Sequence, residues 1–274
     1  MMRIERIRES IIDLHVHIPH DEPSWRAKYV KDLTMKLRRT CPGGAVLKSP
    51  SFPTVLLAQL LSEICDMKVH GSLVLNESIG GINVKAVEKA LKEGAKVIWM
   101  PTLDAWNHRR YQGQSGGLTI FNPRGEVLLE VEEILSLIAD HHAVLGTGHL
   151  SPGEVNVLLD EARSLGVNRI FISHVTWGPT FMTIKQQKKL VGRDVFFEYP
   201  LELFIKEKEL REQVVSAIRE VGVEYCIITS SAEFTCTPLD EVWDKGLMML
   251  LEAGFTVEEI YTMAVENPKR LIEG

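Results

Sequence analysis

Residues 143–174 read AVLGTGHLSPGEVNVLLDEARSLGVNRIFISH and contain one complete strand–helix–strand pattern. Two short apolar runs, 143–147 and 169–173, have the composition of strands in a parallel sheet that is buried on both faces. Between them, residues 152–165 show helical periodicity and precede a glycine, which is a common end signal of a helix. The stretch therefore predicts a βα unit followed by a further strand, and each of the two strands is followed by a histidine.

The same alternation runs along the whole chain, because short apolar runs recur eight times with amphipathic segments between them. The predicted strands span residues 11–16, 45–47, 72–75, 96–100, 143–147, 169–173, 194–198 and 225–229. The predicted helices include residues 53–66, 84–93, 127–140, 152–165 and 202–221. Eight βα units close a barrel, and no linker or composition shift divides the sequence. We therefore predict an α/β fold, a TIM-type (β/α)8 barrel, as a single domain over residues 1–274.

The composition is that of an ordinary globular chain, with 274 residues of which 45% are hydrophobic and 25% charged. The formal net charge is −6 and the basic residues are scattered, so we expect neither nucleic acid nor a membrane as a partner. The first 13 residues lack the apolar core of a signal peptide, and no uncharged apolar run is long enough to span a membrane. We expect a cytoplasmic protein that binds a small-molecule substrate, and a homo-oligomer is compatible with this sequence.

Four histidines fall at the carboxyl ends of predicted strands, where TIM barrels carry their reactive groups. His15 and His17 end the first strand, and His149 and His174 follow the fifth and sixth strands. Histidines that precede strands, such as His70, belong to the opposite end of the barrel and are excluded. Imidazole-rich sites suit zinc. We therefore predict that the four histidines bind one or two divalent metal ions, with zinc as the expected metal.

The first strand reads Asp13-Leu14-His15-Val16-His17. The two-residue period of a strand predicts that Asp13, His15 and His17 face the barrel interior, while Leu14 and Val16 face the helices. Two imidazoles with this spacing can converge on one ion. Asp13 would then accept an imidazole N–H and orient the ring of His15.

Besides the histidines, further segments at predicted strand ends and in the last helix match the motifs of a known family. They are Val46-Leu47-Lys48-Ser49, Val74-Leu75-Asn76, Gly80-Gly81-Ile82-Asn83, Trp99-Met100-Pro101-Thr102, Thr147-Gly148-His149-Leu150 and Glu266-Asn267-Pro268 with Leu271. Together with the His-x-His motif, they resemble an uncharacterised branch of the amidohydrolase superfamily of metal-dependent hydrolases. The resemblance covers the whole chain and implies a barrel in which a metal activates water for hydrolysis. It names no substrate.

The eighth strand departs from the pattern of that superfamily. Its members usually end this strand with an aspartate that binds the metal and acts as general base, whereas this chain has Ser230 there. A serine hydroxyl cannot replace a carboxylate as the base near neutral pH. Three readings remain open: Glu233 reaches back into the site, another carboxylate such as Glu198 or Asp104 serves as the base, or the chain has lost the usual hydrolytic mechanism.

The position that would bridge two metals is also unusual. Many superfamily members end the fourth strand with a carboxylated lysine or a glutamate, whereas here Asp104 is the obvious substitute. Lys48 instead ends the second strand, where it would approach the metal if carboxylated or stabilise negative charge as an ammonium, the role that we favour. The predicted catalytic residues are Glu233, Asp104 and Lys48, and the predicted substrate-binding residues are Arg26, Asn76, Glu198 and Ser230.

Residues 102–126 form the longest irregular stretch of the sequence. They contain NHRR at 107–110 and GQSGG at 113–117, and they are longer than a structural connection needs. This composition fits a lid over the active end of the barrel and fits a plain surface excursion equally well.

These observations predict a hydrolase that uses a metal-activated water on an amide, ester or lactone bond of a small polar substrate. One alternative is a phosphoesterase of the PHP type, which also begins with His-x-His, although PHP barrels have seven strands and more acidic residues. The other alternative is a non-catalytic barrel that binds a metal or a metabolite, since Ser230 stands in place of the usual aspartate.

Overall fold

The computed structural model describes residues 4–18, 26–192, 194–232 and 237–273. Its strands are β1 (Ile12–His17), β2 (Gly44–Lys48), β3 (Val69–His70), β4 (Ser72–Val74), β5 (Val97–Trp99), β6 (Val144–Gly146), β7 (Ile170–Ile172), β8 (Val195–Pro200) and β9 (Cys226–Thr229). Its α-helices are α1 (Ile4–Arg8), α2 (Arg26–Thr40), α3 (Val55–Cys65), α4 (Val84–Lys92), α5 (Trp106–Tyr111), α6 (Leu129–Asp140), α7 (Pro152–Ser164), α8 (Ile184–Leu190), α9 (Leu201–Lys206), α10 (Lys208–Val221), α11 (Leu239–Glu252), α12 (Val257–Tyr261) and α13 (Asn267–Glu273). All the predicted strands are present, and β3 is an additional short strand before the predicted third one.

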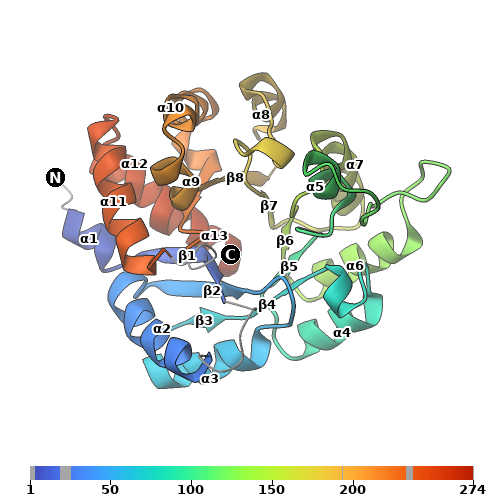
Figure 1. The fold of residues 1–274 in the computed structure, drawn as a ribbon, viewed down its shortest axis with the longest axis horizontal. Coiled ribbons are helices and arrows are strands. Elements are labelled where there is room, and N and C mark those ends of the chain that lie inside the picture. The colour runs from blue at the N-terminus through green and yellow to red at the C-terminus, as the bar shows by residue number, and fades with distance from the viewer. Residues whose placement is uncertain (1–3, 19–25, 193, 233–236, 274) are drawn as a thin grey trace.

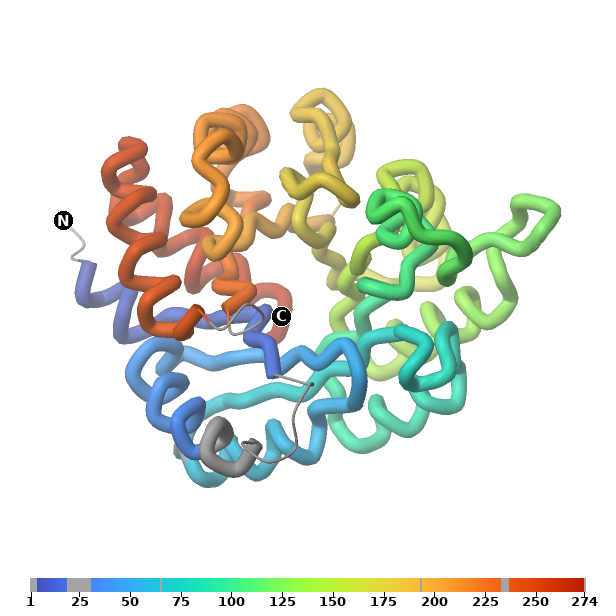
Figure 2. The backbone as a smooth tube through the Cα atoms, viewed as in Figure 1, coloured from blue at the N-terminus to red at the C-terminus, as the bar shows by residue number. Residues whose placement is uncertain are grey.

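The strands are parallel and lie side by side in chain order. β1, β2 and β3 form one hydrogen-bonded sheet, and β4 to β9 form a second. Figure 1 shows the helices in a ring around the strands, from α2 and α3 through α4, α6 and α7 to α10 and α11, and the tube in Figure 2 follows the same circuit. β9 returns to contact β1. This circuit of alternating strands and helices confirms the predicted TIM-type barrel.

Apolar side chains form two layers, one inside the barrel and one between the strands and the helices. Within β5, Val97 and Trp99 belong to the inner layer, while Ile98 packs in the outer one. Leu271 of α13 joins the inner layer. No helix in the described parts of the chain is long and apolar enough to cross a membrane.

Strand β1 contains a register shift against β2 between Asp13 and Val16, as at a β-bulge. Leu14 packs in the inner layer with Val46, whereas Val16 packs in the outer layer. The prediction that Leu14 faces the helices together with Val16 is therefore wrong, because the bulge interrupts the strict alternation of the strand.

A break in the barrel wall separates β3 from β4 at Gly71. Val55 approaches so closely that a Cβ on Gly71 would lie 2.4 Å from Val55 Cα, so the position requires glycine. Within the described residues no ladder joins β2 to β4. Instead, the hydroxyl of Thr54 donates to the carbonyl of Leu47 at 2.8 Å and accepts the N–H of Ser72 at 2.8 Å. Side-chain hydrogen bonds thus join the two sheets here.

The second junction between the sheets lies between β1 and β9, around the buried carboxylate of Asp13. Oδ1 of Asp13 accepts the backbone N–H of Ser230 at 3.1 Å, and Oδ2 accepts the indole N–H of Trp243 at 2.8 Å. The backbone N–H of His17 donates to the carbonyl of Ala232 at 3.1 Å. These contacts close the circuit of strands, and they place the end of β9 against the histidines of β1.

Thr54→Val should lower the free energy of unfolding by about 1–3 kcal/mol, because it removes a buried hydrogen-bond partner of Leu47 and of Ser72. Thr40→Val is the matched control, because among the described residues the buried hydroxyl of Thr40 has no hydrogen-bond partner. Urea denaturation followed by circular dichroism measures both variants. Equal stabilities of the two variants would show that the Thr54 hydroxyl does not hold the sheets together.

Candidate metal centre and cavity

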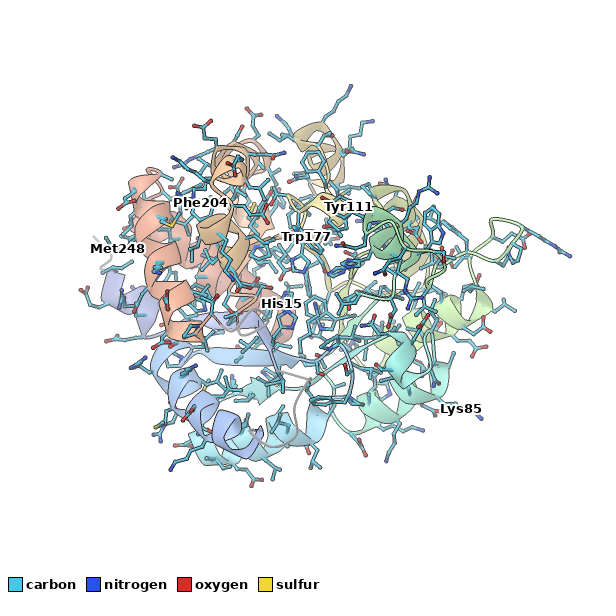
Figure 3. All side chains as sticks on the ribbon, viewed as in Figure 1. His15, Lys85, Tyr111, Trp177, Phe204 and Met248 are labelled. Atoms are coloured by element: carbon cyan, nitrogen blue, oxygen red, sulfur yellow. The ribbon has the colours of Figure 1, made fainter. Side chains whose placement is uncertain are left out.

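A cavity of about 280 Å³ opens at the carboxyl ends of the strands, where TIM barrels place their reactive groups. In Figure 3, His15 lies near the middle of the ring of helices, whereas Lys85 and Met248 lie at the periphery. Strand ends and the segments that follow them contribute polar lining residues, loops contribute apolar ones, and α9 contributes Leu203 together with the charged Glu202 and Lys206. The lining includes His17, Lys48, His149, His174, Ser231, Pro50, Leu103, Trp177, Glu202 and Leu203.

Glu198 of β8 holds the ring of His15. Oε1 of Glu198 lies 2.7 Å from Nδ1 of His15 and accepts the hydroxyl of Thr229 at 2.8 Å. Oε2 of Glu198 accepts the backbone N–H of His174 at 3.3 Å. A carboxylate only accepts hydrogen bonds, so the contact keeps the proton of His15 on Nδ1 and leaves a lone pair on Nε2. Carboxylates orient metal-binding histidines in this way.

Nε2 of His15 faces two further nitrogens, Nε2 of His17 and Nζ of Lys48, each at 3.0 Å. Nζ of Lys48 also lies 3.8 Å from the ring centre of Trp99, in a cation–π arrangement. Burial lowers the pKa of Lys48 to about 7, although the charge of Glu198 acts in the opposite direction. Burial and the charge of Lys48 also lower the pKa of His15 well below its usual range. The cluster is therefore rich in nitrogen, and burial disfavours positive charge on His15 and Lys48.

His174 and His149 face the same cavity from the segments that follow β7 and β6. The ring centre of His174 lies 5.0 Å from that of His15 and 5.4 Å from that of His149. His174 has a φ of 49°, in the left-handed region that non-glycine residues seldom adopt. Burial lowers the pKa of His174 to about 3, although the carboxylate of Glu198 lies 3.6 Å from its Nδ1. Backbone strain of this kind is typical of functional sites.

The donor set of this cluster fits a divalent metal ion. Two ligands about 2.0–2.1 Å from one tetrahedral zinc ion are about 3.3 Å apart. The Nε2 atoms of His15 and His17, at 3.0 Å, approach that spacing. Ligand atoms of His15, His174 and Glu198 also lie within 4.8 Å of one another. Because both oxygens of Glu198 already accept hydrogen bonds, the carboxylate suits the orientation of His15 better than direct ligation.

Asp104 and Asn76 lie in segments that follow strands, but they do not line this cavity. Oδ1 of Asp104 pairs with the guanidinium of Arg109 at 2.7 Å. The side chain of Asn76 donates to the carbonyl of Pro50 at 3.0 Å and accepts the N–H of Thr102 at 2.8 Å. Both side chains thus connect neighbouring loops at the active end of the barrel.

Ser230 follows β9 and is buried away from the cavity, whereas the next residue, Ser231, lines it. The hydroxyl of Ser230 donates to the carbonyl of His15 at 3.3 Å and accepts the N–H of Ala232 at 3.1 Å. The carboxylate of Asp13 accepts the backbone N–H of His15 at 3.0 Å. The prediction that Asp13 orients the imidazole is therefore wrong, because Glu198 holds that ring.

Two predicted residues fall beyond what the structure describes. Glu233 lies outside the described residues, and so does the side chain of Arg26, whose backbone begins α2. The roles assigned to them from the sequence stay predictions.

Two aromatic residues near the histidines were not predicted. His108 comes from α5, inside the stretch 102–126 that was expected to be irregular, and its Nδ1 lies 3.0 Å from Nδ1 of His149. Trp177 packs on the same group, with its ring centre 5.0 Å from that of His149 and 5.7 Å from that of His174. The signals in the sequence were a histidine in the long stretch after the fourth strand and a tryptophan three residues after His174.

Lys48→Met should raise the free energy of unfolding of the metal-free protein at pH 7 by roughly 1–3 kcal/mol, because it removes a buried amine. The folded-state pKa of about 7 lies below the ordinary 10.5, so between these pH values the unfolded chain binds more protons. The free energy of unfolding of the wild type should therefore rise with pH in this window, and its difference from that of the variant should shrink. Urea denaturation at pH 7 and at about pH 9.5 measures this, and a variant less stable than wild type at both values would contradict it.

Comparison with solved structures identifies proteins that share this fold over nearly their whole length. An amidohydrolase from Pseudomonas aeruginosa has a TM-score of 0.67 at 10% identity, with 99% of this chain and 98% of that chain covered. A mutant of organophosphorus hydrolase from Deinococcus radiodurans has a TM-score of 0.62 at 12% identity, with 99% and 95% covered. A proposed 2-pyrone-4,6-dicarboxylic acid hydrolase from Pseudomonas putida has a TM-score of 0.61 at 13% identity, with 96% and 97% covered.

These neighbours confirm the barrel that the resemblance to the amidohydrolase superfamily predicts. Comparison with curated protein sequences gives no match. A family model described as a family of unknown function, DUF6282, matches residues 10–198, a segment that contains β1 to β7 and most of β8. Since this match covers more than half of the chain, the protein belongs to the DUF6282 family.

Proposed function

We propose that the protein is a metal-dependent hydrolase that cleaves an amide, ester or lactone bond of a small molecule. The observation that carries the proposal is that Nε2 of His15 lies 3.0 Å from both Nε2 of His17 and Nζ of Lys48, beside a cavity at the active end of the barrel. The proteins with the same fold include an amidohydrolase and an organophosphorus hydrolase, which supports hydrolysis as the reaction class.

In this proposal His15 and His17 hold the metal, and His149 and His174 contribute from the facing strands. A bound divalent ion, zinc by the chemistry of its imidazole donors, would lower the pKa of water and polarise the substrate carbonyl. Glu198 keeps the ring of His15 in one tautomer and one orientation. The protein supplies neutral donors, because burial lowers the pKa of His15, His149 and His174.

Lys48 is placed to stabilise negative charge that develops on the substrate oxygen. Its Nζ lies 3.0 Å from Nε2 of His15, and the side chain reaches from β2 to line the cavity. A hydrogen-bond donor fixed in a site shielded from water stabilises an oxyanion more strongly than water does. Stacking on Trp99 keeps the amine in place before substrate binds.

The proton of the attacking water requires an acceptor, and we assign it to Glu233. Ser230, the residue after β9, uses its hydroxyl to hydrogen-bond backbone groups and offers no carboxylate. Ser231 lines the cavity, so the chain reaches the site two residues before Glu233. This position would allow Glu233 to act as the general base, the role that an aspartate at the end of the eighth strand has in the superfamily.

The walls of the cavity indicate the shape of the substrate. His17 and Lys48 lie at one polar end. Elsewhere the wall combines apolar surface with two charged side chains of α9; these residues are Pro50, Leu103, Trp177, Leu203, Glu202 and Lys206. A molecule that fills about 280 Å³ would place a polar, hydrolysable group at the histidines and an apolar body against Trp177.

Protein purified without chelators should contain one or two equivalents of divalent metal, and the His15→Ala/His17→Ala double variant should contain almost none. Inductively coupled plasma mass spectrometry measures the content, with His141→Ala, an exposed histidine outside the site, as control. Stoichiometric metal in the double variant would overturn the site. Metal-loaded wild type that binds a metabolite but cleaves no amide, ester, lactone or phosphoester would favour a binding barrel.

Glu198→Gln should weaken metal binding by about 10–100-fold, because the amide cannot accept hydrogen bonds at both of its polar atoms as the carboxylate does. Glu154→Gln is the matched control, since Glu154 is also a buried, hydrogen-bonded carboxylate but caps α7 outside the site. Competition with a fluorescent zinc chelator gives both affinities. Equal affinities in the two variants would show that Glu198 does not orient a metal ligand.

A further inference from the structure

Helix α5 brings two consecutive residues against His149. The side-chain amide of Asn107 donates to the carbonyl of His149 at 3.0 Å and to that of Pro179 at 2.6 Å. Nδ1 of the next residue, His108, lies 3.0 Å from Nδ1 of His149. Tyr111 of the same helix packs so closely over Gly178 that a Cβ on Gly178 would lie 2.3 Å from the hydroxyl oxygen of Tyr111, and Figure 3 labels Tyr111 next to Trp177.

The contact between the two imidazoles is a hydrogen bond with a direction. A neutral imidazole carries one proton on one of its two nitrogens, so one nitrogen donates and the other accepts. Only one proton can lie between two Nδ1 atoms that are 3.0 Å apart. If His149 donates, its Nε2 keeps a lone pair; if His108 donates, Nε2 of His149 carries a proton and cannot bind a metal.

The surroundings of the two rings differ in a way that favours donation by His149. His149 lines the cavity and His108 does not, so His108 supports the ring from behind. Among the described residues, Nε2 makes no hydrogen bond in either ring, so the cavity is what distinguishes them: an unprotonated Nε2 on His149 is available there to a cation. Trp177 packs against both rings, with ring centres at 5.0 Å from His149 and 5.6 Å from His108, and limits their rotation.

We propose that His108 is a positioning residue that accepts the Nδ1 proton of His149 and so keeps Nε2 of His149 unprotonated and directed to the cavity. As a role in the proposed hydrolase, it rests on the proposed function, because it presents His149 as a metal ligand. The arrangement parallels that of His15, whose Nδ1 faces Glu198 at 2.7 Å while its Nε2 faces His17 and Lys48. His108 thereby orients His149 as Glu198 orients His15, by accepting the proton on Nδ1.

The direct test is the tautomer of His149 in metal-free protein labelled with ¹⁵N-histidine. Long-range ¹H–¹⁵N correlation spectra distinguish the two tautomers, and His149→Gln assigns the signals. We expect the Nδ1–H form in wild type and a mixture of forms in His108→Phe, which keeps a ring but has no acceptor. His108→Asn should restore the Nδ1–H form, because the amide oxygen of asparagine can accept near the position of Nδ1.

An Nε2–H tautomer of His149 in the wild type would overturn the proposal, and so would a His149 spectrum unchanged in His108→Phe. If either variant fails to fold, the wild-type spectrum still decides the direction of the hydrogen bond. Since this measurement uses metal-free protein, it stands apart from hydrolysis. The Nδ1–H form in a protein that never binds metal would keep the positioning role and refute the proposed function.

Cobalt(II) titration followed by visible absorption gives a second readout. His108→Phe should weaken the binding of the ion that His149 contacts by about 10-fold, and His108→Asn should stay within about 3-fold of wild type. His141→Asn is the control, since His141 is exposed outside the site. Equal loss in His108→Phe and His108→Asn would contradict a role that depends on the acceptor atom.

Discussion

The hydrogen bond between Glu198 and His15 is the interaction on which the rest of the site depends. It joins β8 to β1 across the inside of the barrel, at 2.7 Å and fully buried. A buried carboxylate requires hydrogen-bond partners, and Glu198 finds them in the ring of His15, the hydroxyl of Thr229 and the backbone of His174. One side chain therefore fixes the relative positions of His15, within the three-stranded sheet, and His174, which follows a strand of the six-stranded sheet.

The cluster around this contact opposes folding. Lys48, His149 and His174 leave water on folding, and burial lowers the pKa of each. A core built for stability would hold apolar side chains at these positions, as the rest of the inner layer does. Nitrogen donors that stay neutral at pH 7 and a lysine with a pKa of about 7 are properties that a reactive site requires. These groups are concentrated at one end of the barrel, apart from the apolar residues that stabilise the fold.

Much of this arrangement could be predicted from the sequence, because parallel strands buried on both faces have a recognisable pattern. The rule that reactive groups follow the strands also pointed to the end where the structure brings His15, His17 and Lys48 together. The side of β1 on which Leu14 packs could not be predicted, since the bulge depends on pairing with β2. His108 was missed because its position depends on how α5 docks against residues 41 positions further along the chain.

The candidate site lies across the two junctions at which the sheets of the barrel wall meet. His15, His17 and Lys48 come from the three-stranded sheet, whereas Glu198 lies within the six-stranded sheet, and His149 and His174 follow two of its strands. Between these sheets the described residues form no continuous ladder. Any ion or molecule that bound residues from both sheets would connect the sheets. The sheets could then separate only if this ligand were released. The resistance of the barrel to opening would then depend on whether this site is occupied.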